Sequence, residues 1–171
     1  MSAARLALAH DSRFVFARRI ITRTIQDSSE DHDTLAPDTF DRKAAEGDFL
    51  LWWQAHGLGY AIPMSITDGL RQKRVVIANV SRTSIASAER LVSRVVVFHV
   101  TAPVPILAAR IAARGREPVE EIAARLARQP GLATDRAPIV EINNDASLER
   151  AAQRFIDELR RLADQTVPAA R

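Results

Sequence analysis

The sequence predicts an α/β fold: a parallel sheet with helices on both faces, in three layers. Two predominantly aliphatic runs, residues 75–80 and 95–100, lack the alternation of polar and apolar residues that marks a half-exposed strand. Segments with helical periodicity separate such runs, and this alternation of strand and helix favours parallel pairing. With 171 residues, 47% of them hydrophobic, the chain can bury one core. We therefore expect a single domain over residues 1–165 and a frayed tail over 166–171.

Each further element follows from local signals along the chain. Pro37 can occupy the first turn of a helix that continues to Glu46 and ends at Gly47. The acidic stretch 26–34 is expected to be a loop, and Asp145 or Ser147 can cap the closing helix through a side-chain oxygen. The remaining expected strands are 14–16, 19–21, 49–54 and 139–142. The remaining expected helices are 2–9, 63–70, 84–91, 105–114, 118–128 and a closing helix that ends near residue 163.

Composition excludes several classes of protein. The chain has no cysteine, which excludes disulfides and thiolate metal sites. Its apolar runs are too short to cross a bilayer and its first residues do not form a secretion signal, so we expect a cytoplasmic protein without membrane contact. The 24 basic residues, against 21 acidic ones, are mostly scattered arginines and not the basic runs of nucleic-acid-binding proteins. A compact anionic ligand held by a few arginines fits this pattern better than a nucleic acid.

Polar residues follow several predicted strands, where the ligand site of an open α/β sheet is expected. They are Arg23, the stretch 56–60, the stretch 79–82 and the stretch 143–145. Guanidinium groups bind phosphate oxygens in pairs, so Arg23 and Arg82 together predict a phosphorylated ligand at this edge of the sheet.

A second group of arginines lies in the predicted helices between residues 105 and 128. Gly115, flanked by Arg114 and Arg116, could serve as a hinge that folds cations over a nucleotide. Arg110 and Arg125 could join the same lid. The alternative for Arg110, Arg114 and Arg125 is a solvated helix face.

The stretch 52–60 admits two interpretations. Two tryptophans, a histidine, two glycines and a tyrosine suit either the wall of a ligand site or a β-hairpin whose tryptophan pair is core. His56 could act as an acid or base near neutral pH, or it could make a structural hydrogen bond. Glu30 and Asp31 could hold a sugar hydroxyl or Mg²⁺ through water, or simply be solvated. The other histidines lack zinc-ligand spacing, and we assign no metal site.

Together these pieces resemble the guanylate-kinase-like branch of the nucleoside monophosphate kinases, and within it the ribose 1,5-bisphosphate phosphokinases of phosphonate catabolism. The resemblance covers the chain from about Phe14 to Leu162. The matching pieces are Arg19-Ile20-Ile21-Thr22-Arg23, Ser29-Glu30-Asp31-His32, Phe40, Trp52-Trp53, His56-Gly57-Leu58-Gly59-Tyr60, Val76-Ile77-Ala78-Asn79-Val80-Ser81-Arg82, the Arg-Gly-Arg within 110–116, and Asn143-Asn144-Asp145.

The resemblance implies a P-loop kinase fold and phosphoryl transfer from ATP, with Mg²⁺, to ribose 1,5-bisphosphate, which gives 5-phosphoribosyl diphosphate. It implies a substrate-binding part at about 24–65 and a lid at about 110–128. His56, with Trp52 and Trp53, would distinguish a sugar bisphosphate from a guanine nucleotide. The implied substrate-binding residues are Arg19, Arg23, Glu30, Asp31, His56, Tyr60, Asn79 and Arg82. The implied ATP-binding residues are Arg110, Arg114, Arg116, Arg125, Asn143, Asn144 and Asp145, of which Arg114 and Arg116 are candidates for a catalytic role.

One departure from the family pattern concerns the phosphate loop. The family begins with a strand and a glycine-rich Walker A loop, which ends in Gly-Lys-Ser/Thr and wraps phosphates with backbone N–H groups. This chain has six glycines, none before Gly47, and no Gly-Lys pair. The first strand and phosphate loop are therefore missing, which predicts weak ATP binding and either unpaired or closed edges at the neighbouring strands. We expect a start assigned at an internal methionine, or a truncated gene, in preference to a new mode of phosphate binding.

Two alternative functions stay open. One is a guanylate-kinase-type nucleoside monophosphate kinase, although histidine and tryptophan stand in the stretch 52–60 where an acidic residue is expected for guanine. The other is a non-catalytic remnant that binds a sugar phosphate. The sequence does not determine the oligomeric state.

Overall fold

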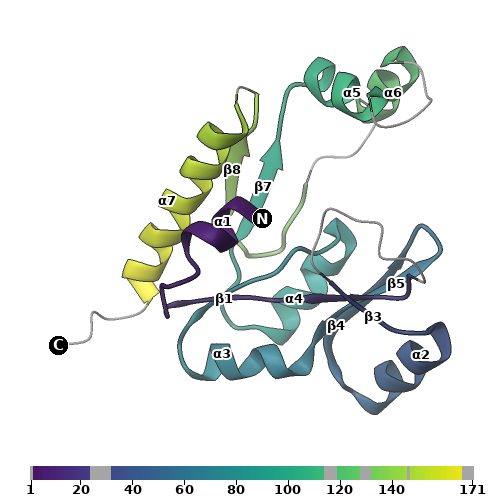
Figure 1. Cartoon of the computed structure of the whole chain (residues 1–171), viewed down its shortest axis with the longest axis vertical. Coiled ribbons are helices and arrows are strands. Elements are labelled where there is room, and N and C mark those ends of the chain that lie inside the picture. The colour runs from purple at the N-terminus through teal and green to yellow at the C-terminus, as the bar shows by residue number, and fades with distance from the viewer. Residues whose placement is uncertain (1, 24–31, 114–118, 128–131, 146, 167–171) are drawn as a thin grey trace.

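The computed structural model of this chain describes residues 2–23, 32–113, 119–127, 132–145 and 147–166. Both helices and strands occur through these residues as predicted, and the described strands form three small sheets (Figure 1). No helix in this part of the chain is long and apolar enough to cross a bilayer. The strands are β1 (Phe14–Phe16), β2 (Arg19–Ile21), β3 (His32–Thr34), β4 (Phe49–Ala55), β5 (Leu58–Pro63), β6 (Val75–Ile77), β7 (Val97–Thr101) and β8 (Ile139–Asn143). The helices are α1 (Ser2–Ala7), α2 (Pro37–Glu46), α3 (Thr67–Arg71), α4 (Ile85–Leu91), α5 (Val104–Ala112), α6 (Val119–Ala127) and α7 (Leu148–Thr166), with 3₁₀ turns η1 (Met64–Ile66) and η2 (Arg82–Ser84).

The largest sheet has the strand order β3-β2-β5-β4 and mixes parallel with antiparallel pairs. β2 runs parallel to β3, whereas β5 runs antiparallel to both β2 and β4. His56 and Gly57 join β4 to β5 with φ angles of 53° and 72°, and this left-handed pair matches the twist of a two-residue hairpin. The predicted hairpin over residues 52–60 is therefore confirmed, but the expectation that both tryptophans are core holds only for Trp53, because Trp52 is exposed. β3 differs from the prediction, which places a loop at 26–34, and the helix predicted from residue 63 begins after β5 as η1 and α3.

Two parallel pairs of strands, β1-β6 and β7-β8, complete the sheets of the described residues. β6 ends at Ile77, whose carbonyl accepts a hydrogen bond from the Ala17 N–H (2.8 Å), so the strand predicted over 75–80 is shorter than expected. Within the described residues no strand pairing connects β6 to β7. The predicted α/β class with parallel strands is confirmed, and the described strands lie in two parallel pairs and one mixed sheet.

An apolar core joins the two parallel pairs. Phe98 of β7 packs against this core and meets Phe155 of α7 edge-on, with ring centroids 5.0 Å apart. α7 lies along β8 and beside α1, and α5 and α6 stand together away from it (Figure 1). Side-chain packing, instead of a backbone ladder, therefore connects β6 and β7. The buried members of the core are Ala4, Leu8, Phe14, Ile77, Ile156, Leu159 and Ala163.

A second apolar region lies beneath α2. Phe40, Phe49 and Ala61 are buried there, and the two phenylalanine rings lie 5.0 Å apart. Gly59 faces Phe40 so closely that a Cβ at this position would lie 2.9 Å from the nearest ring carbon. Close packing against the ring therefore requires glycine at position 59.

We expect Gly59→Ala to lower the free energy of unfolding by about 1–3 kcal/mol, the usual cost of overpacking a buried contact. The added methyl group overlaps the ring of Phe40, which is itself buried and cannot move into solvent. Urea denaturation measures the change. In a Phe40→Leu background the same substitution should cost less, and an equal cost in both backgrounds would show that the methyl group clashes elsewhere.

Candidate functional site

The alternation of side chains along β4 separates its two tryptophans. Trp53 lies opposite Tyr60 of β5, and Trp52 lies opposite Ala61. Successive residues of a strand point to opposite faces, so Trp53 shares a face with Tyr60, and Trp52 lies on the face that α2 covers. Trp53 is 8% exposed and Trp52 is 51% exposed. Of the two tryptophans expected at one recognition site, only Trp53 is placed to contribute on the Tyr60 face.

Tyr60 is held between an aromatic ring and a cation. The Trp53 ring stacks on it with centroids 5.6 Å apart and an angle of 7° between the planes. The guanidinium carbon of Arg19 lies 5.4 Å from the Tyr60 centroid. Because the strand order is β2-β5-β4, Trp53 and Arg19 approach Tyr60 from opposite sides. The predicted substrate residues Arg19 and Tyr60 are thus in contact. The Trp53 ring packs on the other side of the Tyr60 ring and helps to fix its position.

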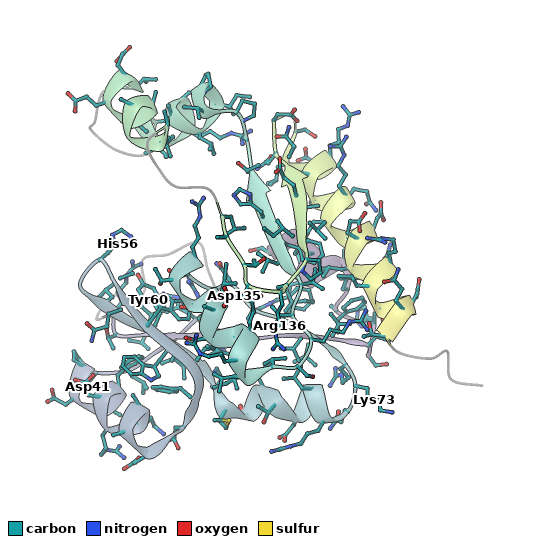
Figure 2. The ribbon with its side chains drawn as sticks, turned by 180° about the vertical axis from the view of Figure 1, so that it is seen from behind. Asp41, His56, Tyr60, Lys73, Asp135 and Arg136 are labelled. Atoms are coloured by element: carbon teal, nitrogen blue, oxygen red, sulfur yellow. The ribbon has the colours of Figure 1, made fainter. Side chains whose placement is uncertain are left out.

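The end of β2 and the start of β5 bring other predicted residues to one end of the mixed sheet. The N–H of Thr22 donates to the Gly59 carbonyl (3.0 Å), and the Gly59 N–H donates to the Thr22 hydroxyl (2.8 Å). Arg23 follows directly, so it emerges beside the β4–β5 turn. His56 lies exposed at the tip of that turn (Figure 2). Arg23 and His56 therefore share one end of the sheet, as the sequence predicts.

The chain that follows β6 packs against the face of the mixed sheet that contains Tyr60. Val80 and Ala78 pack against the buried cluster that contains Trp53, and Tyr60 packs against that cluster too. The Ser81 hydroxyl then accepts the N–H of Thr83 (3.3 Å) and starts η2. Asn79 lies between Ala78 and Val80, and Arg82 follows as the first residue of η2, so both belong to a chain stretch that packs against the Tyr60 face.

A separate group of predicted residues gathers where β8 ends. Arg110 of α5 donates to the Asn144 carbonyl (2.7 Å), and the Asn144 N–H donates to the Thr101 carbonyl (2.6 Å). The Asn143 side-chain amide donates to Asp145 (3.0 Å). Arg110 is therefore joined to the stretch 143–145, so this arginine is not simply on a solvated helix face.

The same region contains a cavity and two buried acceptors. The side-chain oxygens of Asn143 and Asn144 are buried, and neither accepts a hydrogen bond from any described residue. Such oxygens suit a ligand that brings N–H donors. A cavity of about 120 Å³ next to Asn143 involves two arginines of α7, Arg150 and Arg154, that were not predicted, because helix-face arginines look solvated in a sequence. It is lined by Asn143, Asp145, Ser147, Arg150, Ala151 and Arg154.

Glu89 of α4 is a buried charged residue that was also not predicted. It is 3% exposed. Its Oε1 accepts the N–H groups of Arg136 (2.9 Å) and Ala137 (2.6 Å), and its Oε2 accepts that of Asp135 (3.1 Å). These N–H groups, that of Arg136 foremost, hold the pKa of the Glu89 carboxyl below its ordinary value against the opposing effect of burial. The one sequence signal that could have found it is its position four residues after the apolar Ile85, on the same face of the predicted helix.

Several predicted site residues lie outside the described residues, namely Glu30, Asp31, Arg114 and Arg116. The side chain of Arg125 on α6 is outside them as well. Their roles stay predictions. Among the residues that the structure does describe, no three His, Asp or Glu side chains come together as a metal site.

The two tryptophans should respond differently to truncation. We expect Trp53→Ala to lower the free energy of unfolding by about 3–5 kcal/mol, as for a buried aromatic residue. Trp52→Ala, half exposed on the opposite face, should cost less than about 1 kcal/mol. Urea denaturation of both variants measures the difference, and similar losses would contradict the assignment of the two faces.

The low pKa of Glu89 predicts a pH-dependent contribution to stability. A carboxyl whose pKa is lower in the folded protein stabilises it above the ordinary value of 4.5, and that contribution disappears as the pH falls through the folded-state pKa. The unfolding free energy of the wild type should therefore exceed that of Glu89→Gln at neutral pH, and the difference should shrink in acid. A difference independent of pH between 7 and 3 would contradict a charged Glu89.

No protein-family model matches the chain. The ribose 1,5-bisphosphate phosphokinase PhnN of Brucella melitensis is 45% identical over 167 residues, which cover 98% of this chain and 87% of that protein. The enzyme of the same name from Methylobacterium radiotolerans is 44% identical over 157 residues, or 92% and 86% of the two chains. A bifunctional ribose 1,5-bisphosphokinase-thymidine phosphorylase of Cupriavidus pinatubonensis is 43% identical over 157 residues, which make up 26% of that protein.

The fold is also similar to a solved structure. The guanylate kinase from Anaplasma phagocytophilum aligns with a TM-score of 0.69 and 14% sequence identity, covering 98% of this chain and 82% of that one. At this identity the similarity shows the fold, which is guanylate-kinase-like.

Proposed function

The chain belongs to the ribose 1,5-bisphosphate phosphokinase family, and we propose that it phosphorylates ribose 1,5-bisphosphate with ATP. The observation that carries the proposal is 45% identity to the Brucella melitensis protein along nearly the whole chain. In the proposed reaction an oxygen of the 1-phosphate attacks the γ-phosphorus of ATP, ADP leaves, and the product is 5-phosphoribosyl diphosphate. Guanidinium groups assist such a transfer by binding the phosphates and stabilising the charge on the transferred group.

We place the sugar bisphosphate on the Tyr60 face of the mixed sheet, with residues 24–65 as the substrate-binding part. Arg19 is already held over the Tyr60 ring, which supports a phosphate contact at this point. Arg23 continues from the same strand toward the β4–β5 turn. The remaining proposed substrate-binding residues are Glu30, Asp31, His56, Asn79 and Arg82.

We place the adenine end of ATP at the stretch 143–145. The buried oxygens of Asn143 and Asn144 support this, because the amino group of adenine is a hydrogen-bond donor. Residues 110–128 would form the lid over the ATP phosphates. Mg²⁺ would bind mainly through phosphate oxygens and water, as is usual for this ion. The proposed lid arginines are Arg110, Arg114, Arg116 and Arg125.

We further propose that the 171-residue chain binds ATP weakly. It contains no Gly-Lys pair and no glycine before Gly47, so it lacks the backbone N–H groups and lysine with which a Walker A loop binds phosphates. The same observation favours a second candidate function, non-catalytic binding of a sugar phosphate.

Substitution of Arg23 tests the substrate site independently of ATP. A lost charge-assisted hydrogen bond to phosphate should raise the Kd for ribose 1,5-bisphosphate by on the order of 10–100-fold in Arg23→Ala, measured by isothermal titration calorimetry. Arg71→Ala is the control, because Arg71 is exposed on α3 and pairs with Asp68 (2.8 Å). Equal affinities of the two variants would exclude Arg23 from the site.

A kinase assay with Mg²⁺-ATP then separates the candidate functions. Formation of 5-phosphoribosyl diphosphate from ribose 1,5-bisphosphate, above the rate with guanosine monophosphate, supports the proposal. Faster conversion of guanosine monophosphate would favour a nucleoside monophosphate kinase. Sugar-bisphosphate affinity without ATP affinity or product would favour the non-catalytic function.

A further inference from the structure

The proposed sugar-bisphosphate site and the proposed adenine site lie in two different parts of the fold. The first part, residues 14–92, holds β1 to β6 and the Tyr60 face. The second part, residues 97–145, holds β7, β8, α5 and α6. No strand pairing joins β6 to β7 in the described residues, so other contacts must fix the position of the second part against the first.

The hydrogen bonds of Glu89 join these two parts directly, and we call them the Glu89 contact. Glu89 belongs to α4 in the first part, and its three donors, the N–H groups of Asp135, Arg136 and Ala137, belong to the second. The Arg136 guanidinium adds a bond to the Val92 carbonyl at the end of α4 (3.0 Å). Asp135 and Arg136 lie in the segment that runs past α4 (Figure 2). The segment is therefore fixed to α4 just before β8 begins.

β8 is consequently held at both ends by charged side chains that bond to backbone groups. At its start, Glu89 accepts the N–H groups of residues 135–137. Beyond its end, Arg110 of α5 donates to the Asn144 carbonyl (2.7 Å). The stretch 143–145 thus takes its position from α4 at one end of the strand and from α5 at the other.

We propose that Glu89 is a positioning residue that sets the second part of the fold, with the stretch 143–145, against the Tyr60 face. α4 follows η2, whose first residue is Arg82 on the proposed substrate side, so the Glu89 contact connects the substrate side to β8 through one short helix. The expected effect on ATP binding rests on the proposed function, whereas the expected effect on the relative position of the two parts does not. A buried carboxylate suits this task because its two oxygens accept several N–H groups at once. A buried carboxylate that lost these hydrogen bonds would cost a large amount of free energy, so the contact resists separation.

Glu89→Gln changes this contact with little change in shape. The glutamine side chain keeps one acceptor oxygen and turns the other site into a donor that faces a backbone donor. Amide hydrogen exchange followed by NMR should show protection at residues 135–137 falling by about tenfold or more. Glu141→Gln is the matched control, since Glu141 is an exposed carboxylate on β8. Glu89→Asp keeps the charge on a shorter side chain and provides a second variant if the first folds poorly.

A distance measurement tests positioning without any ligand. The chain has no cysteine, so spin labels can be attached at Asp41→Cys on α2 and Ala109→Cys on α5, both exposed. The distribution of distances between the labels should broaden in Glu89→Gln and stay unchanged in Glu141→Gln. In the kinase assay, KM for ATP should rise about tenfold in Glu89→Gln while kcat stays within about twofold.

The outcomes separate positioning from a local structural role. Lost protection together with a broader distance distribution supports the proposal. Unchanged protection, or lost protection with unchanged distances and unchanged KM, overturns it and leaves Glu89 as a local contact. If the wild-type chain shows no kinase activity, the proposed function fails, and the distance distribution alone decides whether Glu89 positions the two parts.

Discussion

In the described part of this protein, apolar side-chain packing connects strand pairs that a continuous ladder of backbone hydrogen bonds connects in many α/β folds. In the described residues β6 pairs with β1, β7 pairs with β8, and no hydrogen-bonded register connects the pairs. Phe98 and the core beneath α7 supply contact between them, but apolar contact is non-directional and fixes position less strictly than a ladder. This constraint explains the importance of the few directional contacts that cross between the pairs. Glu89 provides three of them, and Arg136 provides another through its hydrogen bond to the Val92 carbonyl (3.0 Å).

The mixed sheet shows how one hairpin organises both of its faces. The alternation along β4 and β5 places Trp53 and Tyr60 on one face and Ala61 on the other, while Gly59 leaves room for Phe40. The face beneath α2 is therefore filled by close packing. The opposite face presents a tyrosine fixed between Trp53 and Arg19. A rigid ring that also orients a cation is a suitable starting point for phosphate recognition, because little side-chain freedom is lost on binding.

The sequence predicts the helices and buried strands of this fold well, since aliphatic runs and helical periodicity are local signals. β3 and β5 are not predictable in the same way. His32-Asp33-Thr34 is polar, and residues 58–63 contain glycine and proline, so β3 becomes a strand through its pairing with β2, and β5 through its pairing with β4 and β2. In the site, residues that follow strands could be predicted from topology alone. The partners of Glu89 could not, because they lie 46 to 48 residues away along the chain.

The opposite placement of Trp52 and Trp53 gives the molecule distinct optical properties. They are the only tryptophans in the chain, and Tyr60 is its only tyrosine. Trp53 is shielded from water and stacked on Tyr60, whereas Trp52 is half in solvent. Their emission should therefore differ in wavelength, and quenchers dissolved in water should reach Trp52 first. Replacement of Trp52 by phenylalanine would leave one shielded fluorophore beside Tyr60, an intrinsic reporter of events on that face of the sheet.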